Sequence, residues 1–278
     1  MKKISRRSFL AAAGLSVAAL ALTACGGSAS SVASSVASSA SSAAASTSAA
    51  AGELTTVEAG KLTMATNAAF PPYEMTTDAG EFEGIDIETA QAIADKLGLE
   101  LQIDDMDFDA ALLSVQQGKA DIVMAGVTVT DERKAVMDFS DSYATGIQSI
   151  IVPEGSDIAS PDDLAGKKIG TQRGTTGYIY CSDDFGDENV VAYDDGLTAI
   201  QALNNGQVDA VVIDNAPAKE FVAANPGLVI LDTSYAEEDY AIGMAKGSSL
   251  EDAVNAVLEE LKADGTLQSI VDKYITAE

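Results

Sequence analysis

The chain contains an internal repeat that limits the folds open to it. The segment Leu112–Gly126, LLSVQQGKADIVMAG, aligns without gaps on Ile200–Asp214, IQALNNGQVDAVVID. Each copy has the pattern of a helix end, a glycine turn, an aspartate and an apolar strand. The repeat predicts two similar units whose equivalent strand ends, at Gly126 and Asp214, face a shared cleft. The alternative is that chance, or the common pattern of αβ units, produces the match.

Strand and helix patterns alternate around the repeat. Alternation of this kind is typical of parallel sheets covered by helices. If the last two helices return to the first unit, extended crossings near residues 144–149 and 239–243 join the units as a hinge. We expect helices at residues 85–97, 108–117, 195–205, 250–263 and 266–274, and strands at residues 61–66, 99–103, 121–125, 167–171 and 239–245.

The first 24 residues have the pattern of an export signal, with a basic start and a short apolar run. The run is too short for an ordinary membrane span. Leu22–Cys25 resembles the lipobox of bacterial lipoproteins, which implies cleavage before Cys25 and a diacylglyceryl anchor there, with palmitate as the expected acyl group. Ser5–Leu10, SRRSFL, also resembles a twin-arginine signal, so the export route stays open.

A linker separates this signal from the globular part. Residues 25–53 consist almost wholly of serine, alanine and glycine after the cysteine, a composition that cannot bury a core. We therefore expect a flexible tether between the lipid anchor and a globular part that begins near Leu54.

Composition excludes several classes of function. The chain has 43 acidic and 16 basic residues, a formal net charge of −27, so its surface repels nucleic acid and anionic lipid. It has no histidine and only two cysteines, Cys25 and Cys181. Ser-His and Cys-His catalysis and zinc sites with imidazole ligands are therefore excluded. We expect no metal, no cofactor and no nucleic-acid partner, and we expect Cys181 to be a packed thiol.

The segment Met124–Arg133 joins an apolar strand to a Gly/Thr turn and one arginine. A guanidinium offers two parallel N–H donors that match the two oxygens of a carboxylate. The turn at Gly126–Thr128 adds backbone groups at the carboxyl end of the strand, where open α/β sheets bind ligands. We interpret the segment as half of a carboxylate site. The alternative is that Arg133 pairs with Asp131 or another surface acid.

Six motifs together resemble a known family. The motifs are Ala65–Glu74, Gly84–Glu88, Met106–Phe108, Met124–Arg133, Gly174–Gly177 and Ile213–Asp214. Over about residues 60–275 the chain resembles the extracytoplasmic solute-binding proteins of family 3, which are polar amino acid ABC transporter proteins such as the glutamine- and histidine-binding proteins.

The resemblance implies an α/β fold of two lobes, of the type II periplasmic-binding-protein kind. Each lobe would have a mostly parallel sheet flanked by helices, and a two-strand hinge would join them. The first lobe would comprise residues 54–145 and 242–278, and the second lobe residues 146–241.

The resemblance also implies a ligand site. Arg133 and backbone amides near Thr128 and Thr176 would hold an α-carboxylate, and Asp214 with oxygens around Gly126 would hold an α-ammonium group. Phe70 and Phe108 would form aromatic walls. The full expected set of ligand-binding residues is Asn67, Phe70, Phe108, Ala125, Gly126, Thr128, Arg133, Gln172, Thr176 and Asp214.

Three positions near this site carry separate expectations. Asn67 departs from the aspartate that family members binding basic or amide side chains often have, which favours an uncharged ligand side chain. Tyr73 is expected either in the wall or in the core. Arg173 is expected either to read an acidic ligand side chain or to lie in solvent.

The function implied is capture of a free amino acid with a polar or uncharged side chain by lobe closure, and its delivery to the permease subunits of an ABC transporter. The protein would be a monomeric lipoprotein on the extracytoplasmic face of the membrane, and not an enzyme. Two alternatives share the fold: a ligand-sensing domain, and an enzyme similar to cyclohexadienyl dehydratases with Glu74 or Asp105 as its acid. Neither acid has a sequence context that separates it from a surface acid.

Overall fold

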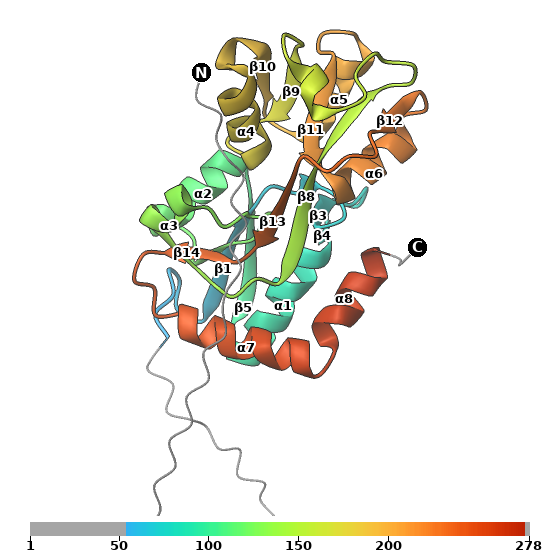
Figure 1. Cartoon of the computed structure of the whole chain (residues 1–278). Coiled ribbons are helices and arrows are strands. Elements are labelled where there is room, and N and C mark those ends of the chain that lie inside the picture. The colour runs from blue at the N-terminus through green and yellow to red at the C-terminus, as the bar shows by residue number, and fades with distance from the viewer. Residues whose placement is uncertain (1–53, 276–278) are drawn as a thin grey trace, which may run out of the picture. The chain divides into compact units, whose positions relative to one another are not determined.

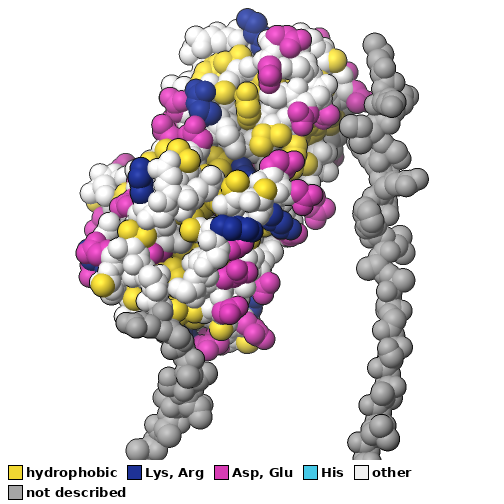
Figure 2. All heavy atoms as spheres, turned by 90° about the vertical axis from the view of Figure 1, so that its left-hand side faces the viewer, with side chains coloured by type: hydrophobic (Ala, Val, Ile, Leu, Met, Phe, Trp, Pro, Cys, Tyr) yellow, Lys and Arg dark blue, Asp and Glu magenta, His cyan; other side chains and the backbone are white. Residues whose placement is uncertain are grey.

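The computed structural model describes residues 54–275, which form two main sheets flanked by helices (Figure 1). The expected signal peptide, the lipidation of Cys25 and the linker lie outside the described residues. Within residues 54–275 no helix is both long and apolar enough to cross a membrane. Figure 2 shows acidic side chains spread over the visible face, as the net charge requires.

The first sheet has the strand order β5-β1-β6-β14-β7. Strand β6 lies at its centre, β1 pairs in parallel with β5 and β6, and β14 pairs antiparallel with β6 and β7. We call the part of the molecule built on this sheet the first lobe. The strands are β1 Lys61–Thr66, β5 Glu100–Asp105, β6 Ile122–Val123, β7 Met137–Phe139 and β14 Gly243–Ala245.

The helices of the first lobe include both C-terminal helices. Ion pairs tie them to α1: Lys96 lies 3.0 Å from Glu260, and Lys273 pairs with Glu88. The chain therefore returns to the first sheet after the second one. The helices are α1 Ile85–Leu97, α2 Phe108–Gln116, α3 Asp131–Val136, α7 Glu251–Ala263 and α8 Thr266–Tyr274; a small sheet adds β2 Ala69–Phe70, β3 Glu74–Thr76 and β4 Phe82–Glu83.

The second sheet has the order β10-β9-β11-β8-β12, with β13 also paired to β8, and we call the part built on it the second lobe. Its strands are β8 Ala144–Pro153, β9 Ile169–Gln172, β10 Val190–Tyr193, β11 Ala210–Asp214, β12 Leu228–Ile230 and β13 Ala236–Tyr240. Its helices are α4 Thr176–Phe185, α5 Gly196–Asn204 and α6 Asn215–Ala224, with short 3-10 turns at Pro161–Leu164 and Asp187–Asn189.

Among the described strands, most of each sheet runs in one direction, as expected, and one strand per sheet runs against the others: β14 in the first sheet and β8 in the second. The strand expected at residues 239–245 is wrong in its extent, because β13 ends at Tyr240 and β14 begins at Gly243. The chain passes from the second sheet to the first between these residues, so it changes partners there.

The paired strands β8 and β13 form the connection between the sheets (Figure 1). Gly146 on β8 lies against the ring of Tyr240 on β13, and a Cβ atom at Gly146 would lie 2.4 Å from that ring. Close approach of the two strands therefore requires glycine here.

The aspartate of each repeat copy holds its strand in the same way. Asp121 accepts a hydrogen bond from the Thr63 backbone N–H (2.7 Å), and its own N–H donates to the Thr63 carbonyl (2.9 Å). Asp209 makes the same pair of bonds with Lys168, both at 2.7 Å. The repeat is thus a structural one, with each aspartate joining a central strand to its neighbour.

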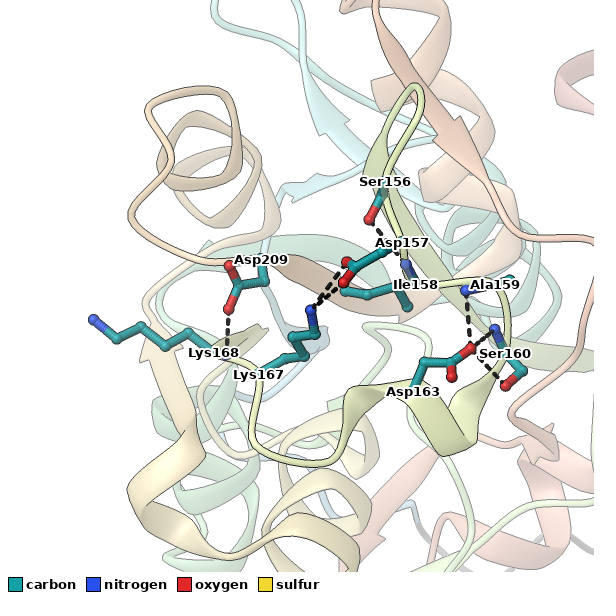
Figure 3. A network of polar contacts seen from close by, with 9 residues as sticks. All are labelled: Ser156, Asp157, Ile158, Ala159, Ser160, Asp163, Lys167, Lys168 and Asp209. Atoms are coloured by element: carbon teal, nitrogen blue, oxygen red, sulfur yellow. Dashed lines mark hydrogen bonds and ion pairs between the residues drawn. The ribbon is translucent and has the colours of Figure 1, made fainter.

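Local polar contacts also fix the connection from β8 to β9 (Figure 3). Lys167 donates to both carboxylate oxygens of Asp157 at 2.9 Å, and the Asp163 carboxylate accepts from the Ser160 backbone N–H at 3.0 Å. This network braces the loop of the second lobe, and none of its residues lines the cavity described below.

Candidate functional site

A small cavity lies where strand ends of both sheets meet. Its lining comes from both lobes and contains all ten residues of the expected set. Two further residues, Glu74 and Thr175, were not expected. The complete lining is Asn67, Phe70, Glu74, Phe108, Ala125, Gly126, Thr128, Arg133, Gln172, Thr175, Thr176 and Asp214.

Arg133 is buried beside this cavity, with 8% of its surface exposed. Its position is set by the start of α3, where the Thr130 side chain accepts from the Arg133 backbone N–H at 3.1 Å. The guanidinium donates to the carbonyl of Thr128 at 2.7 Å and to that of Gly174, in the second lobe, at 3.1 Å. Among the described residues it forms no ion pair with Asp131 or any other acid, so pairing at the surface is excluded in this structure.

The surroundings of Arg133 are apolar on one side. Its guanidinium carbon lies 5.4 Å from the centre of the Phe108 ring, a cation–π distance. Burial lowers the pKa of Arg133 from its usual value. A buried guanidinium with only carbonyl partners has donors to offer an anion that enters the cavity.

Asp214 is the last residue of β11 and is also buried. Its carboxylate accepts from the Tyr240 hydroxyl and from the Gln148 amide, the latter at 2.9 Å. Burial and then the nearby Glu238 raise the pKa of Asp214 to about 7, against the hydrogen bonds from Tyr240 and Gln148. The second strand end thus presents an acid that gains from a cationic partner.

Glu238 is a buried acid that the sequence did not single out. It lies on β13, is 6% exposed and accepts from the Thr128 hydroxyl at 3.2 Å and the Thr176 hydroxyl at 3.0 Å. The available signal was its spacing from Tyr240, because residues two apart on a strand share one face, and both are buried.

A buried acid pair lies at the cavity, with Glu74 in its lining. Glu74 and Asp86 are both fully buried, and Asp86 accepts from the Gly126 backbone N–H at 3.0 Å. Burial, then the neighbouring Asp86, raises the pKa of Glu74 well above its usual value, and burial raises the pKa of Asp86 to about 6. Sequence context did not separate either Glu74 or Asp105 from a surface acid, and in the structure Glu74 is buried whereas Asp105 is exposed.

Side chains from the two lobes also meet directly. The Gln172 amide donates to the Asn67 side-chain oxygen at 2.8 Å, and the Asn67 amide donates to the Met106 carbonyl at 2.9 Å. Phe70 and Phe108 are buried on the cavity wall. This end of the cavity is therefore bounded by aromatic rings and neutral amides.

Three other residues have no place in the cavity lining. Tyr73 stacks on Phe70 with ring centres 5.9 Å apart and lines a second cavity. Arg173 pairs with the exposed Asp194 at 3.3 Å. Cys181 is a buried free thiol whose pKa burial raises to about 12.

Comparison with known proteins identifies similar sequences and structures. The model of the family "Bacterial extracellular solute-binding proteins, family 3" matches residues 62–277. The L-cystine-binding protein TcyJ of Escherichia coli (strain K12) is 33% identical over 80% of this chain and 85% of its own. A probable histidine-binding protein of Neisseria gonorrhoeae is 32% identical over 96% of this chain and 95% of its own.

A solved structure agrees with these sequence matches. An ancestral arginine-binding protein bound to glutamine has a TM-score of 0.75 and 41% identity to this chain. The match covers 78% of this chain and 99% of that one.

Proposed function

The chain belongs to family 3 of the bacterial extracellular solute-binding proteins, and from this premise we propose that it captures a free amino acid by lobe closure for an ABC transporter. The observation that carries the proposal is the placement of Arg133 and Asp214. Asp214 ends the strand of the second repeat copy, and Arg133 lies on α3 just after the turn that follows the strand of the first copy. Both residues are buried and line the same cavity.

Opposite charges on two lobes suit a zwitterion. Arg133 would pair with the α-carboxylate and Asp214 with the α-ammonium group, so that each ligand charge gains a partner as it leaves water. A ligand shifts an equilibrium between open and closed forms only through contacts that differ between them. Contacts divided between the lobes provide that difference, because both form together only when the lobes are closed.

We propose that the ligand side chain is polar and uncharged. The support is the neutral Asn67–Gln172 pair, with Phe70 and Phe108 beside it on the cavity wall. Amides exchange hydrogen bonds with neutral polar groups without adding a charge, and the rings cover apolar atoms.

Several further features belong to the same proposal. Members of this family are extracytoplasmic, and we propose that this one is a monomer anchored to the membrane by a lipid on Cys25 after cleavage of residues 1–24. Its partners would be the permease subunits of the transporter. We propose lobe boundaries at 145/146 and 241/242, which the antiparallel pairing of β8 with β13 supports.

A panel of amino acids tests the proposal. The fragment 54–278 holds both sheets and their buried cores, and its thermal unfolding would be followed with each common amino acid and close analogues. A ligand at 100 times its dissociation constant adds about 2.7 kcal/mol to the free energy of unfolding, an easily measured shift. No response to any amino acid would overturn the proposal.

A further inference from the structure

One carboxylate oxygen of Glu238, Oε2, accepts hydrogen bonds from side chains of three separate elements. The Thr128 hydroxyl lies 3.2 Å from Oε2, the Thr176 hydroxyl 3.0 Å and the Gln148 amide nitrogen 2.9 Å. Thr128 follows β6 of the first lobe, Thr176 begins α4 of the second lobe, and Gln148 lies on β8. The other oxygen, Oε1, is buried and has no hydrogen-bond partner among the described residues.

We infer that Glu238 is a positioning residue that orients the hydroxyls of Thr128 and Thr176 at the ligand cavity and stabilises the closed arrangement of the lobes. This inference rests on the proposed function, since it assigns a role within the same site. It concerns a residue outside the cavity lining, which acts through two residues that are part of it.

The geometry makes the arrangement sensitive to closure. The two threonine hydroxyls lie 3.5 Å apart, although one belongs to each lobe. Separation of the lobes moves Thr128 and Thr176 apart, so one Glu238 oxygen cannot keep both donors. A hydrogen bond to a charged acceptor is stronger than one between neutral groups. Its loss on opening therefore favours the closed form.

Backbone contacts explain why the carboxylate is fixed in place. Val129 N–H donates to the Asp239 carbonyl at 3.0 Å, and Ala241 N–H donates to the Val127 carbonyl at 3.1 Å. These bonds flank Thr128 and hold it beside β13. Among the described residues no backbone hydrogen bond joins the start of α4 to β13, so Thr176 reaches Glu238 through its side chain alone.

Gln148 links Glu238 to the ammonium side of the site. Its amide nitrogen lies 2.9 Å from both the Asp214 and the Glu238 carboxylates. Within residues 54–275 Arg133 forms no ion pair with an acid, but the negative charge of Glu238 acts to raise the pKa of Arg133 against the larger, lowering effect of burial. Glu238 is therefore coupled to both of the charged ends proposed for the ligand.

The test compares Glu238→Gln with Glu237→Gln, since Glu237 is the exposed acid next to it on β13. Both substitutions remove one charge and keep the side-chain size. Calorimetry with the amino acid selected by the panel should show affinity weakened about 10-fold to 100-fold in Glu238→Gln and unchanged in Glu237→Gln. Equal affinities in the two variants would overturn the inference.

A measurement without ligand separates this inference from the proposed function. Leu113 and Leu197 are exposed on α2 and α5, so Leu113→Cys and Leu197→Cys accept a pair of fluorescent labels, whereas Cys181 is fully buried. Energy transfer should report a shift towards the open form in Glu238→Gln and none in Glu237→Gln. Unchanged transfer in both variants would overturn the inference even if the wild-type protein binds amino acids.

A second pair of variants tests the inference even if Glu238→Gln does not fold. Thr176→Ser keeps the hydroxyl and Thr176→Val removes it. The population of the open form should increase in Thr176→Val and should not change in Thr176→Ser. Identical energy transfer in both Thr176 variants would contradict the inferred role of Glu238. A wild-type protein that binds no amino acid would refute the proposed function alone.

Discussion

The two copies of the repeat begin alike and end differently. Asp121 and Asp209 bond to a neighbouring strand through the same two backbone contacts. At the far ends, Gly126 has a φ of +55°, which opens a turn towards Thr128 and Arg133, whereas Asp214 places a carboxylate at the strand end itself. The aspartates shared by the two copies are structural. The copies differ in the charge that follows at the cavity, which is positive at Arg133 and negative at Asp214.

The largest effect on ligand affinity should come from removing Arg133, the positive residue of the site. Arg133→Ala is expected to weaken amino acid binding at least about 100-fold, because a buried ligand carboxylate would lose its charged partner. Isothermal calorimetry measures this. Arg173→Ala is the matched control, since Arg173 pairs with Asp194 outside the cavity, and its affinity should match that of the wild type. Wild-type affinity in Arg133→Ala would refute the role of Arg133.

Removing the negative end should have the next largest effect. Asp214→Asn keeps the shape but loses the charge, and we expect about 10-fold to 100-fold weaker binding of the amino acid. A ligand analogue without the amine should bind the variant and the wild type alike. If the variant binds the amino acid as tightly as the wild type does, Asp214 does not hold the ammonium group.

These two ends were predictable from sequence because each belongs to a local motif. The boundaries of α1 and α8 also agree with expectation, since their apolar spacing and flanking residues are local signals. The burial of Glu74 and the placement of Glu238 were not predicted, because burial of an acid depends on partners distant in the chain. Which strand of each sheet runs against the others was not predicted for a related reason, because strand direction follows from where the chain crosses between the sheets.

Acid pH should weaken ligand binding through Asp214, the negative residue of the site. Because the pKa of Asp214 is raised from 3.8 to about 7, its protonated form is populated below pH 7, and an ammonium ligand must displace that proton. Affinity should be nearly constant between about pH 7 and pH 8 and should fall up to about 10-fold per pH unit below pH 7.

Calorimetry near pH 6 in two buffers of different ionisation enthalpy should detect release of a proton on binding. The Asp214→Asn variant should release fewer protons on ligand binding than the wild type does. The same shift makes the folded ligand-free protein bind more protons than the unfolded chain between about pH 4 and pH 7, so its free energy of unfolding falls as pH rises through that range. Affinity that is constant from pH 8 to pH 5 would contradict this assignment.

The smallest effect on binding should come from the shared scaffold. Asp121 is buried and accepts from the backbone N–H groups of Val57 and Thr63, both at 2.7 Å, whereas Asp209 is exposed and accepts from that of Lys168. Asp121→Ala should lower the free energy of unfolding by about 1–3 kcal/mol, because it leaves buried donors without partners, and Asp209→Ala should lower it less. Urea unfolding measures both, and calorimetry should find ligand affinity unchanged in each. If either variant loses affinity as Arg133→Ala does, the scaffold and the charged ends are not separable, and the repeat contributes to binding along its whole length.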